Sequence, residues 1–163
     1  MSVLESLDPD GERFRAFVLR LEPRLHAALV AVYGHDRGRE ATAEALAYAW
    51  EHWGKVQTMA NPTGYLYRVG QSRIRRRKEP VVYLPPVDQV DQEVVVEPRL
   101  LTALASLSER QRVTVVLIHV EGWTLREVAE LLGISIPTVQ KHAERGMAGL
   151  RTTLKIGLAG EIR

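Results

Sequence analysis

Cationic and polar side chains lie close together near the carboxyl end of the chain. Lys141 and Arg145 are four residues apart, so on a helix they would project from the same face. Side chains of these types donate hydrogen bonds to guanine edges and to phosphate oxygens. A further set of polar residues shares this segment and has the chemistry to contact a DNA groove: Ser135, Thr138, Gln140 and His142.

A second basic segment lies near the middle of the chain. Residues 62–78 carry arginines and a lysine but no acid, whereas residues 79–98 carry acids and no base. A local cluster of positive charge is typical of a surface that binds nucleic acid, but it is also typical of an ordinary solvated face. Both interpretations remain open for this segment.

Other kinds of chemistry find little support in the sequence. The chain has no cysteine, which excludes disulfides, thiolate metal sites and cysteine nucleophiles. No glycine-rich phosphate loop, pair of catalytic carboxylates or serine elbow is present. The histidines lie far apart, without the spacing of a helical metal site: His26, His35, His52, His119 and His142. We therefore expect no enzyme activity, no metal and no cofactor.

The composition also bears on the compartment and on the number of domains. With 163 residues, of which 45% are hydrophobic, the chain can form one ordinary domain or two small ones. The absence of cysteine fits a reducing compartment, and no signal peptide or spanning stretch of about 20 apolar residues is present. We expect a cytoplasmic protein that does not insert into membranes.

Helix-start signals divide the second half of the chain into four expected helices. Pro98 opens the first, and Ser108 with Gln111 forms a capping box for a second that ends near Gly122. Thr124 and Glu127 form another capping box, for a short helix that stops at Gly133. A last helix, capped by Ser135, follows.

The last two expected helices have the spacing of a helix-turn-helix over residues 125–144. Ala129 is small enough for a close helix crossing, Gly133 accepts a left-handed backbone, and Ile134 and Val139 would hold the helices together. The alternative is an ordinary helical hairpin in a bundle. The last helix argues against that alternative because its charges are mainly basic: Lys141, Arg145, Arg151 and Lys155 against Glu144.

The first half is predicted to be a helical bundle. Apolar residues recur at helical spacing over residues 12–33, where Pro23 should either start a new helix or kink a long one, and again over residues 38–53. Asn61 and Pro62 should cap and open a third helix. Periodicity is lost over residues 79–98, so we expect an all-α chain with domains at 1–78 and 99–163 that fold independently around this acidic, proline-containing linker.

These segments resemble the extracytoplasmic-function (ECF) sigma factors of RNA polymerase. The stretch SLSERQRVTVVLIHVEGWTLREVAELLGISIPTVQKHAERGMAGLR is similar to the family's fourth region, which binds promoters. In the first half, FRAFVLRLEPRLHAALVAVYG, ATAEALAYAWEHW and NPTGYLYRVGQSRIRRRK resemble the helices of the second region. The resemblance implies a factor that binds core RNA polymerase, directs it to promoter DNA and helps to open the duplex.

The resemblance also implies roles for individual residues. Contacts to the minus-35 element would come from Arg126, Ser135, Thr138, Gln140, Lys141, His142 and Arg145. The single-stranded minus-10 element would meet the stacking faces and charges of Trp53, Tyr65, Tyr67, Arg68, Ser72, Arg73 and Arg75. Core polymerase would meet Glu40, Glu44, Tyr48 and Glu51. For each aromatic residue a place in the hydrophobic core remains the alternative.

Two departures from the family pattern affect these expectations. Alanines fill much of the polymerase-binding helix, which predicts weaker core binding and a need for a helper protein or a high level of the factor. Ser72 and Arg76 replace the family's usual Asn and Asp on the minus-10 helix, so a different base preference is expected.

A stand-alone helix-turn-helix regulator is the alternative function. An anti-sigma factor or other regulatory protein is a possible further partner.

Overall fold

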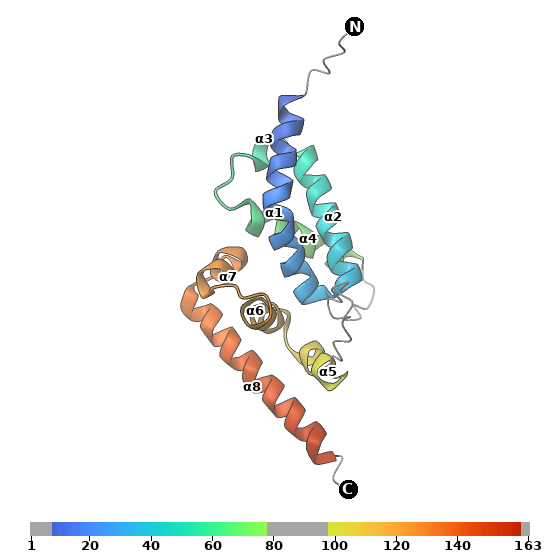
Figure 1. The fold of residues 1–163 in the computed structure, drawn as a ribbon, viewed down its shortest axis with the longest axis vertical. Coiled ribbons are helices and arrows are strands. Elements are labelled where there is room, and N and C mark those ends of the chain that lie inside the picture. Colours follow the sequence, from blue (N-terminus) through green and yellow to red (C-terminus); the bar gives the residue numbers. More distant parts are fainter. Residues whose placement is uncertain (1–7, 78–97, 161–163) are drawn as a thin grey trace.

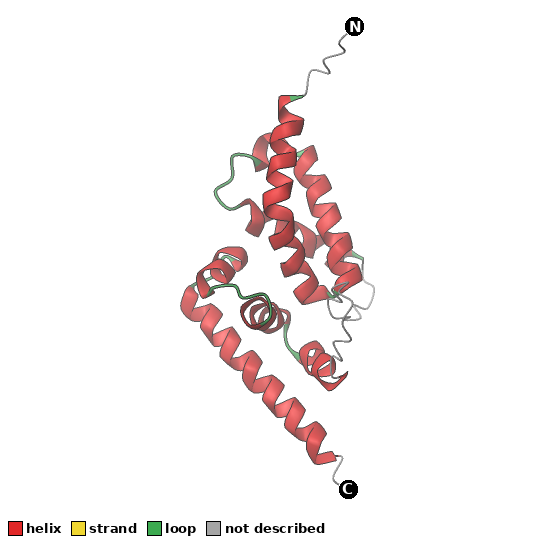
Figure 2. Ribbon diagram, viewed as in Figure 1, coloured by secondary structure: helices red, strands yellow, loops and turns green. Residues whose placement is uncertain are grey.

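The computed structural model describes residues 8–77 and 98–160, and within these ranges every regular element is an α-helix (Figure 2). The predicted all-α class is confirmed. The first half of the chain contains α1 (Pro9–Tyr33), α2 (His35–Glu51), α3 (Trp53–Val56) and α4 (Pro62–Arg76). The second half contains α5 (Pro98–Ser106), α6 (Glu109–His119), α7 (Leu125–Leu132) and α8 (Ile136–Gly160).

Helix α1 is continuous across Pro23, which settles the choice left open by the sequence. Leu21 and Leu25, on either side of the proline, are both buried in the core, so burial of one apolar face favours a single helix. After α1 the chain reverses into α2, and the two helices approach closely at Gly38. A Cβ added there would lie 2.5 Å from the Cα of Val30, so only glycine permits this backbone approach.

The predicted helix caps are present. Asn61 accepts a hydrogen bond from the backbone N–H of Gly64 at 3.0 Å at the start of α4. Both capping boxes are formed, by Ser108 with Gln111 at α6 and by Thr124 with Glu127 at α7. Helix α6 ends at His119 rather than near Gly122, because residues 120–123 form the loop that leads into α7.

The two groups of helices pack against each other. Figure 1 shows α6 nearly end-on between α8 and the group α1–α4, and α6 contacts both α1 and α8. One cluster of buried side chains runs from Leu25 and Leu66 in the first half to Leu117 and Val139 in the second. A smaller cluster lies within the second half and contains Ala103, Leu107, Val115 and Leu150. Independent folding of the two halves remains a prediction.

The proposed linker lies almost entirely outside the described residues. Helix α5 begins at Pro98, which the sequence analysis placed at the end of the linker and also at the start of a helix. The segment with Val94, Val95 and Val96, expected to be extended, is likewise outside the described part of the chain. The domain boundaries therefore stay as predicted from the sequence.

Candidate nucleic-acid interface

Helices α7 and α8 form the predicted helix-turn-helix. Gly133 has a φ of 65°, the left-handed conformation that ends α7, and the N–H of Ile134 donates to the carbonyl of Ala129 at 3.2 Å. Ala129 and Val139 are buried where the two helices meet. Ser135 caps α8 by accepting from the N–H of Thr138 at 3.3 Å. The turn is thus built from the residues that the sequence predicted.

The outer face of α8 carries cations that are open to solvent. Thr138, Lys141 and Arg145 follow each other at intervals of three and four residues and share this face. Lys141 and Arg145 are exposed. Arg126, which belongs to α7, is exposed as well. This part of the candidate minus-35 surface is therefore assembled and accessible.

Two of the predicted minus-35 residues lie at the flanks of that face. Gln140 donates to Glu144 at 3.3 Å and borders a groove that also includes Ile118 of α6. His142 is half-buried on the opposite flank. Burial, and then the charges of Arg110 and Arg145, lowers the pKa of His142, so its ring is neutral at neutral pH. His142 could donate or accept a hydrogen bond but would not provide a positive charge.

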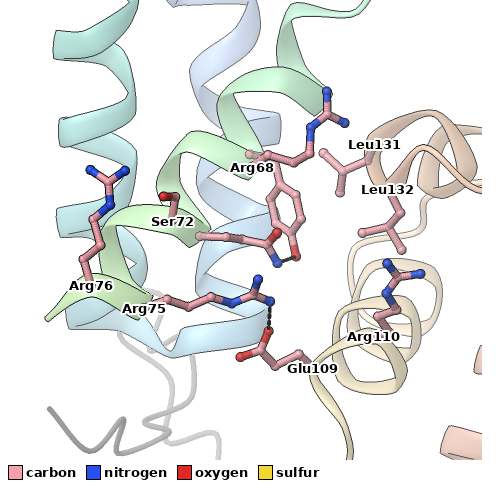
Figure 3. Close-up of a pocket in the computed structure, with 10 residues that line it drawn as sticks. Arg68, Ser72, Arg75, Arg76, Glu109, Arg110, Leu131 and Leu132 are labelled. Atoms are coloured by element: carbon pink, nitrogen blue, oxygen red, sulfur yellow. Dashed lines mark hydrogen bonds and ion pairs between the residues drawn. The ribbon is translucent and has the colours of Figure 1, made fainter. Parts of the chain in front are cut away.

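Several predicted minus-10 residues line a cleft between the two halves of the molecule. Arg68 and Arg75 project from α4 toward α6 and α7 in Figure 3, and Ser72 also lines the cleft. The cleft has a volume of about 480 Å³, and its other wall includes Glu109 and Arg110. Arg75 donates to the carboxylate of Glu109 at 3.1 Å. Part of the candidate minus-10 surface is therefore in contact with the second half.

Two of the three aromatic residues predicted to stack on bases belong to the core instead. Trp53 is 9% exposed and packs against Phe14 and Phe17, with ring centroids 5.3 and 5.1 Å away. Tyr67 is 2% exposed, and its hydroxyl accepts from Gln71 at 3.2 Å. Burial raises the pKa of Tyr67 well above its ordinary value. Neither ring has a face open to a base in this conformation, which corrects the stacking assignment for both.

Tyr65 differs from these two rings because it is only half-buried. Its hydroxyl lies 2.9 Å from that of Tyr48, and the Lys55 ammonium lies 5.3 Å from the centre of its ring. Arg73, on the same helix, is half-buried too. The pair of tyrosines joins α4, predicted to bind the minus-10 strand, to α2, predicted to bind polymerase. No local sequence pattern indicates this link.

The four predicted polymerase contacts form a single stripe along α2. Glu40, Glu44, Tyr48 and Glu51 are separated by four, four and three residues and so share a face. Arg77, just beyond α4, donates to Glu40 at 2.9 Å and also to Glu44. Both carboxylates are therefore already paired within the chain, a feature that sequence analysis did not anticipate.

Further contacts between the halves come from residues that the sequence analysis did not single out. Arg24 of α1 pairs with Glu127 of α7 at 3.0 Å and lies over the ring of Trp123 at 4.6 Å. Asn61 donates to the backbone carbonyl of Glu130 at 2.6 Å. Charged and aromatic groups thus join α1 and the start of α4 to the helix-turn-helix.

The buried side chain of Arg112 makes another of these contacts. It donates to the carbonyl of Val32 at the end of α1 at 2.5 Å. It also donates to carbonyls at the end of α5 and just beyond it, those of Leu104, Ala105 and Leu107, at 2.9, 3.1 and 3.0 Å. One guanidinium group therefore links the end of α1 to the end of α5.

Comparison with known proteins agrees with this geometry. Residues 98–150 match the family model for Sigma-70, region 4. The RNA polymerase sigma-E factor of Streptomyces coelicolor is 32% identical over 119 residues, which cover 68% of this chain and 67% of that protein. The chain belongs to the ECF family of RNA polymerase sigma factors.

The similarity of this sigma factor to its relatives extends over both halves. The ECF RNA polymerase sigma factor SigK of Mycobacterium sp. (strain KMS) is 26% identical over 164 residues, covering 89% of this chain and 84% of the relative. The alternative of a stand-alone regulator has no support from these matches. No helix in the described ranges is both long and apolar enough to cross a membrane.

Two solved structures share the fold of this sigma factor. The sigma factor RpoE of Bartonella quintana, in complex with the anti-sigma factor NepR, superposes with a TM-score of 0.61 at 22% identity, over 89% of this chain and 98% of that one. CnrH, in complex with the cytosolic domain of CnrY, has a TM-score of 0.58 at 20% identity and covers 89% of each chain.

Proposed function

We propose that this sigma factor binds core RNA polymerase and directs it to promoters, reading the minus-35 duplex with α8 and the minus-10 strand with α4. The observation that carries the proposal is the exposed face of α8, where Lys141 and Arg145 stand on an intact helix-turn-helix. An exposed helix that carries two cations on one face can enter the major groove of duplex DNA and contact bases and phosphates. The chain itself would supply binding and positioning rather than catalysis.

The minus-10 surface that we propose is narrower than the sequence suggested. Tyr65 supplies the remaining partly open aromatic ring, and Arg68, Ser72, Arg73 and Arg75 supply polar and cationic contacts on α4. Arg68 and Arg75 lie in the cleft against α6 and α7. We therefore infer that the two halves separate, at least locally, when the minus-10 strand binds.

Regulation by a partner protein is part of the proposal. The two solved structures described above are complexes with a second protein, and one of these partners is an anti-sigma factor. The groove between α6 and α8 and the stripe on α2 lie outside the contact between the halves and are open to such a partner. We propose an anti-sigma protein as a regulatory partner of this chain.

Run-off transcription with purified core polymerase tests the main proposal. The full chain should yield a transcript of defined length from a candidate promoter, whereas core enzyme alone should yield none. Scrambling the minus-35 element should abolish the transcript, because α8 would lose its base contacts. Duplex binding without any transcript on a panel of candidate promoters would contradict the proposed role.

A second measurement addresses polymerase binding through α2. Arg77 donates to the carboxylates of Glu40 and Glu44, and Glu40 also pairs with Arg37 at 3.5 Å. Arg77→Ala should therefore free Glu44, leave Glu40 paired with Arg37, and tighten binding to core polymerase about two- to fivefold, the scale of a partly exposed ion pair. Glu44→Ala should weaken binding to a similar degree. Competition against a housekeeping sigma factor for limiting core enzyme measures both effects.

The control for this measurement is Arg76→Ala, which removes a neighbouring exposed cation that has no carboxylate partner among the described residues. Arg76→Ala should leave core binding unchanged. If Arg77→Ala and Arg76→Ala behave alike, or if Glu44→Ala has no effect, the stripe on α2 is not the polymerase contact.

A further inference from the structure

We propose that the cleft between α4, α6 and α7 is a binding site for a small phosphorylated ligand of the nucleotide class, which holds the two halves of the chain together. The inference goes beyond the proposed function, and its test does not require a promoter. Three observations support it: the cleft is positively charged, both halves of the chain contribute residues to its walls, and it has the volume and the apolar wall of a small-molecule site.

The charge of the cleft is strongly positive. Arg68, Arg75, Arg76 and Arg110 line it, against the single carboxylate of Glu109. That carboxylate is already engaged, because it accepts from Arg75 at 3.1 Å and from the hydroxyl of Tyr33 at 3.3 Å. Within the described ranges, no carboxylate pairs with Arg68 or Arg110. The guanidinium groups of Arg68 and Arg110 therefore lack a counter-charge that a bound anion would provide.

Arg68, Arg75 and Arg110 come from both halves and lie around the same space, whereas the Arg76 side chain points away from α6 and α7 (Figure 3). In Figure 3, Arg68 and Arg75 extend from α4 toward α6 and α7, and Arg110 extends from α6 toward Leu132 of α7. Arg68 also reaches the end of α7, where its Nη1 atom would lie 3.7 Å from a Cβ placed on Gly133. An anion bound to Arg110 together with Arg68 or Arg75 would bridge the halves.

The size and lining of the cleft indicate the class of ligand. Its volume of about 480 Å³ is within the range of small-molecule sites, roughly 300–1,000 Å³. Guanidinium groups bind phosphate through paired hydrogen bonds. Leu132, which is half-buried, and the buried Leu131 form an apolar wall beside the cations, and a flat ring can pack against Leu132. Phosphates next to an aromatic ring are the defining features of a nucleotide.

Calorimetric titration of the full chain with ATP and with inorganic tripolyphosphate, at about physiological ionic strength, tests the proposal. Both probes should bind, ATP more tightly because only ATP has a ring to place against the leucines. Arg110→Ala should weaken ATP binding about tenfold or more, as expected for the loss of a charge-assisted hydrogen bond. Arg110→Lys should recover part of the affinity.

The matched control is Arg39→Ala, which removes an exposed cation of α2 outside the cleft. It should leave ATP binding unchanged. An equal loss with Arg39→Ala and Arg110→Ala would reveal general attraction to a basic protein and overturn the site. Absence of binding by wild-type protein at millimolar ATP would do the same, and equal affinity for the two probes would refute the nucleotide assignment.

A second readout separates this ligand from the phosphates of promoter DNA. Arg110 is not among the proposed minus-10 contacts, so Arg110→Ala should bind a single-stranded minus-10 oligonucleotide as wild type does. ATP should compete with that oligonucleotide on wild-type protein and much less on Arg110→Ala. If Arg110→Ala weakens both ligands equally, the cleft is simply part of the DNA surface. Run-off transcription tests the proposed function separately.

Discussion

Replacing Arg112 by alanine should lower the free energy of unfolding by about 3 kcal/mol, since buried carbonyl groups would lose their donor. The Arg112 side chain donates to the carbonyl of Val32 in the first half and to those of Leu104, Ala105 and Leu107 in the second. Arg112 is 9% exposed, so water cannot readily replace these hydrogen bonds. Urea unfolding followed by circular dichroism measures the loss.

The variant Arg112→Lys provides a matched comparison. An ammonium group keeps the charge but cannot span carbonyls that the planar guanidinium reaches in different directions, so an intermediate loss is expected. Arg39→Ala, an exposed arginine removed from α2, should leave the unfolding midpoint unchanged. A midpoint for Arg112→Ala within error of wild type would show that the hydrogen bonds of Arg112 contribute nothing to stability.

The contact between the halves can be followed in the same variants. Because the chain has no cysteine, Ala47→Cys in α2 and Thr152→Cys in α8 allow a donor and an acceptor dye to be attached to exposed positions. Energy transfer between the dyes should fall in Arg112→Lys relative to the parent protein.

Limited proteolysis is a second measurement on the same variant. Cleavage within residues 79–98, the predicted linker, should be more rapid in Arg112→Lys than in the parent protein.

Local features of the fold could be predicted because their causes are local in the sequence. A capping box needs only Thr124 and Glu127, three residues apart, and the left-handed turn needs only Gly133. Asn61 before Pro62 is a similar short signal. Each of these pairs or single residues fixes a helix end without reference to the rest of the chain, and each helix end appeared where it was expected.

The contact between the halves could not be predicted in this way. Arg112 and Val32 are separated by 80 residues, and the pair Arg75 and Glu109 by 34. Nothing in the neighbourhood of either residue specifies such a partner. The one available signal was the position of Arg112 directly before the buried run from Val113 to Leu117, where a charged side chain must find hydrogen-bond partners.

Helix geometry alone argues against stacking by both predicted tyrosines of α4. Tyr65 and Tyr67 are two residues apart on α4, which places them about 200° apart around the helix. They cannot both face the same strand. The structure buries Tyr67 and leaves Tyr65 partly open, as this spacing requires. Trp53 gave no comparable signal, because its burial depends on Phe14 and Phe17 of α1.

The two candidate DNA surfaces differ in how far the contact between the halves covers them. Helix α4 contacts α7, and its arginines line the cleft. Helix α8 contacts α5, α6 and α7 through its buried side, while Lys141 and Arg145 remain exposed. The protein as described can therefore meet a minus-35 duplex without rearrangement, so binding to this duplex directly tests the exposed face of α8.

Lys141→Ala and Arg145→Ala should each weaken binding to a matched minus-35 duplex about tenfold or more. The double variant should bind this duplex about a hundredfold more weakly than wild type. A bidentate contact to a guanine contributes about 1–3 kcal/mol, and each 1.4 kcal/mol corresponds to about a tenfold change in affinity. Both side chains are exposed on one face of α8, so neither substitution should disturb the fold. Gel-shift titration measures the affinities.

A scrambled duplex of the same length distinguishes the kinds of contact. Loss of a base contact should narrow the difference in affinity between matched and scrambled duplexes, whereas loss of a phosphate contact should weaken both equally and reduce the salt slope by about 0.9. Gln140→Ala is the matched control, because Gln140 pairs with Glu144 at the flank of the face and its loss should have a smaller effect. If Gln140→Ala weakens binding as much as Arg145→Ala does, the duplex contacts the groove side of α8 and the recognition face must be reassigned.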